Sequence, residues 1–293
     1  MERLAGTTAA NVTAVWALFG VVAVEIVVTY ARVAPTELYH VSGTGAAAGF
    51  GRALVFLNFP VALAALPLLA LAADRLPRSP VAMATSLLAG ALCAVVFWPG
   101  VVDQGDLDAR PVNALPAVGV ALAVILTAAA RLFRGRVRIH PGAAVLVVPL
   151  LVLAIPWLAA DLGFSLDGVP VLGSIFLTGK IVGGHAAVHV GHHHGMDGVL
   201  LALAALALIP AARQVPARAL RAAACMYIGL ELAYGLANAV QDGWLEQVVK
   251  RGWTGFEIPS VLHPAASLAW LGIAIAGAVF STLVLRPIPR WAR

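Results

Sequence analysis

Residues 11–33 read NVTAVWALFGVVAVEIVVTYARV, an apolar run that is long enough to cross a lipid bilayer. About 20 predominantly apolar residues span the hydrocarbon core of a bilayer as a helix, and this run contains only two charged residues, Glu25 and Arg32. No small-residue cleavage site follows a short apolar core, so the run is expected to be a retained span rather than a signal peptide.

The rest of the chain has the same apolar character. Hydrophobic residues make up 61% of its 293 residues, charged residues make up 11%, and the mean hydropathy is +0.93. A soluble domain has about 25% charged residues, so this composition excludes an ordinary soluble enzyme, a disordered chain and a coiled coil. The sequence predicts an all-α, polytopic integral membrane helical bundle, with residues 1–293 forming a single transmembrane domain.

Similar apolar runs recur along the chain and predict about eight crossings. The loops between them alternate in charge, because 131–138 is strongly basic whereas 103–110 and 161–167 are acidic. Basic loops stay in the cytoplasm, so we expect both termini to be cytoplasmic in a cell membrane, and we assign the net charge of +5 to orientation rather than to nucleic-acid binding. The expected spans are 11–33, 53–73, 81–102, 114–133, 142–160, 197–212, 222–241 and 260–285.

Residues 171–194 do not fit this alternation as a further crossing. An odd number of crossings must separate the acidic loop at 161–167 from the basic loop at 213–221. The stretch 171–212 is nevertheless long enough for two segments, with a break in the Gly-Met-Asp-Gly sequence at 195–198. The simplest solution is one span over 197–212 and a re-entrant or interfacial helix over 171–194 on the outer side, covered by protein or lining a cavity.

Five of the eight histidines lie within residues 185–194, in this expected helix. On a helix, four of the imidazoles share an arc of about 100°: His185, His189, His192 and His193. Histidines one helical turn apart can bind one metal ion, and imidazole serves zinc, copper and iron. We therefore expect a divalent metal site here, with His263 as a further candidate ligand. The alternatives are a proton-responsive histidine cluster and a hydrated surface without a metal.

The span 222–241 carries a polar stripe within an arc of about 100°, formed by Glu231, Tyr234, Asn238, Gln241 and Asp242. Such a stripe cannot face lipid, so we expect it to face the histidine helix. The first span carries Glu25 on the same face as Thr29 and Arg32. The candidate catalytic groups are Glu231, Asp242 and Glu25, each as a further metal ligand or a general base. The alternative is a structural hydrogen-bond network between helices.

Two classes of function fit these features. The first is a metal-dependent membrane enzyme that acts on a lipid or another apolar substrate, by hydrolysis or oxidation, with zinc favoured over iron or copper because the site is remote from cytosolic reductants. The second is a metal-ion or proton-coupled transporter. A haem held by His189 and His263 is a third option. Asn58, which precedes Pro60, is interpreted as a structural residue at a proline kink.

Overall fold

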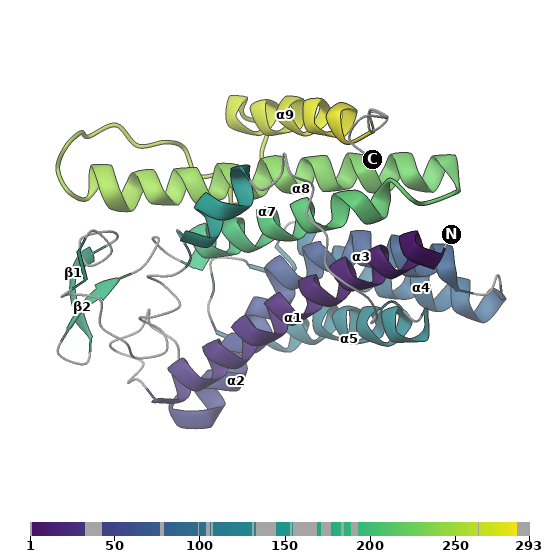
Figure 1. The fold of residues 1–293 in the computed structure, drawn as a ribbon. Coiled ribbons are helices and arrows are strands. Elements are labelled where there is room, and N and C mark those ends of the chain that lie inside the picture. The colour runs from purple at the N-terminus through teal and green to yellow at the C-terminus, as the bar shows by residue number, and fades with distance from the viewer. Residues whose placement is uncertain are drawn as a thin grey trace.

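The computed structural model describes residues 2–32, 43–76, 79–98, 100–103, 106, 108–130, 132, 145–152, 154, 169–170, 177–182, 185–188, 193–262 and 264–285. The main elements (Figure 1) are the helices α1 (Glu2–Arg32), α2 (Gly45–Phe56), α3 (Ala62–Arg75), α4 (Pro80–Cys93), α5 (Ala114–Ala129), α7 (His193–Ala212), α8 (Arg218–Trp244) and α9 (Leu268–Leu285). Short turns extend them: a π-helical turn at Leu57–Val61, another at Leu245–Val249, and 3-10 turns at Ala94–Phe97 and Pro111–Asn113. Residues 145–152 are also helical.

Six helical stretches in the described part of the chain are long and apolar enough to cross a membrane. They are Ala10–Arg32, Gly45–Arg75, Pro80–Phe97, Pro111–Ala129, Gly195–Ala212 and Arg218–Val249. This confirms a helical bundle that contains several helices apolar enough to span a membrane. The count of about eight spans is not confirmed, because Leu268–Leu283 is a shorter apolar helix and the predicted span 142–160 is described as helix only over 145–152 and at residue 154.

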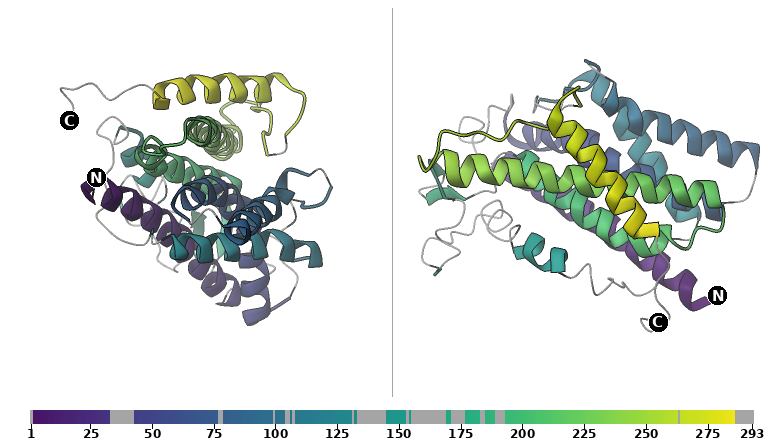
Figure 2. Two further views of the ribbon diagram at one scale, coloured as in Figure 1. Left: turned by 90° about the vertical axis from the view of Figure 1, so that its right-hand side faces the viewer. Right: turned by 90° about the horizontal axis from the view of Figure 1, so that it is seen from above.

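Helices α7 and α8 run antiparallel side by side, whereas α1 and α9 are inclined to them (Figures 1 and 2). The start of α1, the connection between α7 and α8, and the end of α9 all lie at the same end of the bundle (Figures 1 and 2). This end carries Arg213, Arg218 and Arg221, whereas the first residue of α2 and the start of α7 lie at the opposite end. The placement agrees with the alternation of basic and acidic loops that the sequence shows.

The second span is one continuous helical stretch in spite of its prolines. A π-helical turn at Leu57–Val61 contains Pro60, which cannot donate a backbone hydrogen bond. Asn58 is fully buried there, and its amide donates to the carbonyl oxygens of Leu54 and Asn113, each at 2.8 Å. Asn113 returns a hydrogen bond to Asn58 Oδ1 at 2.6 Å. These bonds tie the kinked helix to the start of α5 and confirm the structural interpretation of Asn58.

Helix α7 lies at the centre of the bundle. In its span 89% of the residues are buried, against 17% in Pro80–Phe97, so the latter stretch lies at the periphery. Helix α8 packs along α7, and α9 covers the outer side of α8 (Figure 2). A Cβ atom at Gly198 would lie 2.6 Å from the carbonyl oxygen of Gly235, and a Cβ at Gly235 equally close to that of Gly198. Only glycine lets the two backbones approach this closely.

The segment before α7 corrects the expected histidine helix. Residues Leu177–Val182 and His185–Val188 form two antiparallel strands, β1 and β2, in which Val182 pairs with His185. A helix over 171–194 is therefore wrong for these residues. The sequence contains the reason: Thr178, Ile181 and Val182 are β-branched, which favours strands, and two glycines separate the strands, which is a hairpin signal. The structure thus combines a helical bundle with one short hairpin.

Candidate functional site

Three charged side chains are buried together where α7 begins. Arg52 on α2 is 2% exposed, Asp197 on α7 is 5% exposed, and Asp242 on α8 is 2% exposed. The positive charge of Arg52 attracts the Asp197 carboxylate, and the negative charge of Asp242 repels it. We call these three residues the charged cluster. Three helices far apart in the sequence therefore contribute one polar centre within an apolar bundle.

Asp242 is held against the first turn of α7. Its Oδ2 accepts a hydrogen bond from the backbone N–H of Gly195 at 2.9 Å. The first four N–H groups of a helix have no partner within the helix, and this end carries a partial positive charge. A carboxylate at this position satisfies one of these donors and is favoured by the helix dipole. It also lies next to the residues that directly follow the histidine run.

Arg52 is held by an aromatic ring as well as by charge. Its guanidinium carbon lies 5.9 Å from the centre of the Tyr30 ring on α1, which is cation–π geometry. Among the described residues its Nε has no hydrogen-bond partner. The charged cluster therefore contains two acidic side chains and one basic side chain, all buried.

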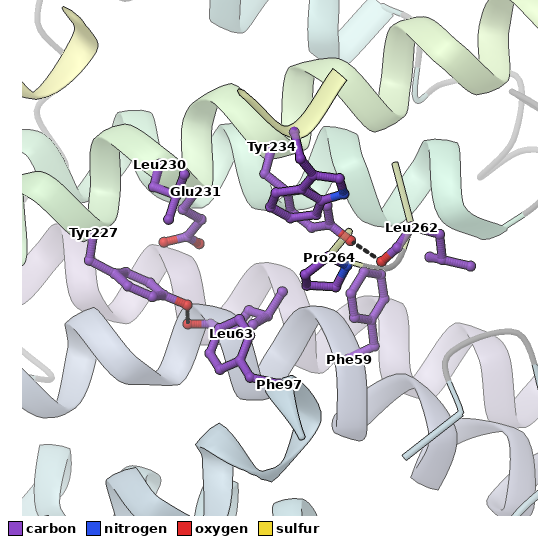
Figure 3. A pocket seen from close by; sticks show the side chains of 10 residues that line it. Phe59, Leu63, Phe97, Tyr227, Leu230, Glu231, Tyr234, Leu262 and Pro264 are labelled. Carbon is purple, nitrogen blue, oxygen red and sulfur yellow. Dashed lines mark hydrogen bonds between the residues drawn. The ribbon is translucent and has the colours of Figure 1, made fainter. Parts of the chain in front are cut away.

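A second polar position lies deeper in the bundle, in an apolar pocket of about 250 Å³. Figure 3 shows the side chains of Tyr227, Glu231 and Tyr234 projecting from α8 into this pocket. Glu231 is 4% exposed, and neither of its oxygens has a hydrogen-bond partner among the described residues. We call this the Glu231 pocket, lined by Phe59, Leu63, Phe97, Tyr227, Leu230, Glu231, Tyr234, Leu262, Pro264 and Trp270.

The two tyrosine hydroxyl groups in this pocket donate hydrogen bonds to backbone carbonyl oxygens. Tyr227 donates to the carbonyl oxygen of Leu63, and Tyr234 donates to that of Leu262, both at 3.0 Å (Figure 3). The indole N–H of Trp270 is buried and has no hydrogen-bond partner among the described residues. The pocket therefore offers one carboxylate and one indole donor in otherwise apolar surroundings.

The predicted polar stripe on α8 is confirmed as an interior face, but its residues lie at two separate sites, the start of α7 and the Glu231 pocket. Glu231, Tyr234, Asn238 and Asp242 are buried. Asp242 lies at the start of α7, as expected for a partner of the histidine segment. Glu231 instead faces the pocket and is about 16 Å from Asp242 along the helix, at 1.5 Å per residue. Whether the stripe also faces the histidine side chains stays a prediction, because those side chains lie outside the described residues.

The predicted metal ligands stay predictions. His189, His192 and His263 lie outside the described residues, and only the backbone of His185 and His193 is described. His185 lies on strand β2 and His193 begins α7, so the helical spacing that grouped them does not apply. Within the described residues, no three histidine, cysteine, aspartate or glutamate side chains are grouped as metal ligands. Glu25 is 5% exposed on α1, and its role as a ligand or general base stays a prediction.

Two members of the charged cluster were not among the predicted site residues. Arg52 directly precedes the predicted second span, and Asp197 is the first residue of the predicted sixth span, within the break at 195–198. Both charges flank apolar runs at the same predicted end of the bundle, and this was the available signal. Comparison of the chain with protein-family models, curated proteins and solved structures gave no match.

Proposed function

We propose that this multi-pass membrane protein binds a divalent metal ion, zinc in preference to iron or copper, where the histidine run meets the charged cluster. There it acts as a metal-dependent enzyme on a lipid or other apolar substrate. One observation supports this more than any other: Asp242, a buried carboxylate, accepts a hydrogen bond from Gly195, one residue after the run that ends at His194. Histidine and carboxylate together are the usual ligands of catalytic zinc.

The charge of the cluster supports a cation at this position. Two carboxylates and one guanidinium are buried there, and an uncompensated charge inside a membrane protein is costly. Neutral imidazoles from the histidine run add ligands without adding charge. The hydrogen bond from Gly195 uses one lone pair of Asp242 and fixes the orientation of the carboxylate.

The residues can be given distinct roles in this proposal. A bound metal ion would lower the pKa of a coordinated water. Asp242 is the proposed further ligand, and Asp197 the proposed general base, while Arg52 limits the repulsion between the two carboxylates. Glu25 remains an alternative general base on α1. Glu231 is not part of this site, because it is about 16 Å away along α8 at 1.5 Å per residue.

Elemental analysis of protein purified without a histidine tag tests this proposal. We expect stoichiometric zinc in the unmodified protein and in Glu257→Gln, an exposed carboxyl-to-amide control, and a loss of zinc in Asp242→Asn and His185→Ala. Zinc binding should weaken as the pH falls through about 6.5, because metal ligation needs neutral imidazole. Absence of any metal in the unmodified protein would overturn the proposal.

A transporter of metal ions or protons is the second candidate. The observation that favours it is Glu231, a buried carboxylate near the middle of the 32-residue span Arg218–Val249, on the same helix as Asp242. Metal uptake into sealed proteoliposomes distinguishes the two functions. Uptake that is abolished by Glu231→Gln favours transport, whereas stoichiometric metal without uptake favours the enzyme.

The orientation is part of the same proposal. Positive loops keep to the cytoplasm, so the end with Arg213, Arg218 and Arg221 is proposed to face inward and the charged cluster outward. A cysteine introduced at position 290 should react with an impermeant reagent only after the membrane is opened. Labelling of intact cells at this position would reverse the assignment.

A further inference from the structure

We propose that the Glu231 pocket binds a lipophilic organic cation, a molecule with a protonated or quaternary amine on an apolar body, which enters from the bilayer. This site is separate from the charged cluster, and the proposal does not depend on a metal. It rests on three features of the pocket: a carboxylate that has no partner among the described residues, aromatic walls, and an opening toward the apolar outer surface of the bundle.

The carboxylate lacks any partner in the described part of the chain. Glu231 is 4% exposed and neither oxygen accepts a hydrogen bond there. Among the described residues, no lysine or arginine forms an ion pair with it. A buried carboxylate without a partner costs several kcal/mol or has to be neutralised. A ligand that brings its own positive charge removes this cost.

Aromatic rings surround this carboxylate. Phe59 meets Tyr234 edge-on at 6.1 Å between ring centres, and Trp270 stacks on Tyr234 at 5.4 Å. Aromatic faces attract ammonium groups, and this attraction is stronger where water is excluded. The tyrosine hydroxyls do not compete for Glu231, since they donate to backbone carbonyls. An ammonium group is therefore the polar group that the pocket is best suited to bind.

The remainder of the pocket suits an apolar body. Its lining is aliphatic and aromatic apart from Glu231, the indole N–H of Trp270 and two tyrosine hydroxyls that are bonded to backbone carbonyls. Phe97 is 46% exposed and Leu230 is 38% exposed, so two lining residues also lie on the apolar outer surface of the bundle. A ligand dissolved in the bilayer can thus reach the pocket from the side, without passing through water.

A matched pair of probes tests the charge of the ligand. Trimethyl(4-phenylbutyl)ammonium and its uncharged carbon analogue, (5,5-dimethylhexyl)benzene, have the same shape. Binding is measured by isothermal titration calorimetry with the full chain in phosphatidylcholine nanodiscs, and empty nanodiscs correct for partition into lipid. We expect saturable binding of one ammonium probe per chain, and binding of the carbon analogue that is weaker by about tenfold or more.

Variants then locate the site. Glu231→Gln should weaken binding of the ammonium probe by about tenfold or more and leave binding of the carbon analogue unchanged. Glu257→Gln, an exposed control, should change the binding of neither probe. Leu230→Trp should block both probes by filling the pocket from its surface side, and this variant keeps the test valid if Glu231→Gln does not fold. Equal binding of the two probes, or ammonium binding that survives both pocket variants, would overturn the proposal.

Discussion

Helix α8 carries two buried carboxylates that differ in their hydrogen bonding. Asp242 and Glu231 are almost equally inaccessible, at 2% and 4% exposure. Asp242 receives a backbone hydrogen bond from Gly195 and lies in a cluster that contains Arg52. Glu231 receives no hydrogen bond from the described residues. Burial therefore does not distinguish the two positions, but the donors that surround each carboxylate do.

Asp242 is thus a carboxylate that other parts of the chain stabilise, whereas Glu231 is a carboxylate that the described residues leave without a stabilising partner. At the charged cluster, a helix end and an arginine compensate much of the negative charge, and a cation would complete the balance. In the Glu231 pocket, no donor of the described residues forms a hydrogen bond to the carboxylate. The four predictions below test this contrast through the free energy of unfolding, measured in detergent by titration with sodium dodecyl sulfate.

The largest effect is expected from Arg52→Gln. Removing the buried guanidinium leaves Asp197 next to the like charge of Asp242. Loss of one partner from a buried charge group costs about 3–5 kcal/mol. Arg75→Gln, at an exposed position at the end of α3, should change stability by about 0.5 kcal/mol or less. The double variant with Asp197→Asn should recover part of the loss, and additive losses would show that the two side chains are not coupled.

The next effect is expected from Gly198→Ala at the crossing of α7 and α8. Its Cβ would lie 2.6 Å from the carbonyl oxygen of Gly235, so the two helices must separate. Overpacking of this kind costs about 1–3 kcal/mol. Because the crossing lies between the two carboxylates, both zinc binding and ammonium binding should weaken. Gly243→Ala, with no atom within 4 Å of the new Cβ, should instead gain up to about 1 kcal/mol of helix propensity.

Opposite signs are expected when each carboxylate is replaced by an apolar side chain of similar size. Asp242→Leu leaves the buried N–H of Gly195 without its acceptor and should destabilise by about 1–2 kcal/mol. Glu231→Met removes a polar group that has no donor among the described residues and should stabilise by about 1–2 kcal/mol. Chemical denaturation of both variants in one detergent measures the contrast. Destabilisation by both replacements would mean that Glu231 has a partner within the chain.

Helical periodicity predicted that both carboxylates of α8 face the interior, but not that they lie at different sites. The stripe on 222–241 was assigned to the interior because lipid offers no hydrogen bonds, and Glu231, Asn238 and Asp242 are indeed buried. The same reasoning treated the stripe as one site. Periodicity shows which side of a helix is polar but not which neighbour lies opposite each turn. Here α7 lies opposite Asp242, whereas α3 and the loop before α9 face Glu231.

The errors arose where local sequence signals were given the wrong weight. Residues 177–188 were assigned to a re-entrant or interfacial helix because the charges of the flanking loops allow only one crossing within 171–212. Their β-branched residues and a glycine pair favour the hairpin that is observed. Arg52 was missed because it directly precedes an apolar run, where a charged residue is usually taken as a loop residue. The structure extends that run back to Gly45, which places Arg52 inside the bundle.

The smallest effect is expected from the tyrosines that line the Glu231 pocket. Tyr227→Phe and Tyr234→Phe each remove one hydrogen bond to a backbone carbonyl, which costs about 1 kcal/mol. The aromatic faces remain, and neither hydroxyl donates to Glu231, so ammonium binding should stay within about twofold of the unmodified protein. Calorimetry and denaturation of the same preparations separate the two effects. A large loss of ammonium binding in either variant, with stability almost unchanged, would assign recognition of the cation to a hydroxyl group and remove the carboxylate from that role.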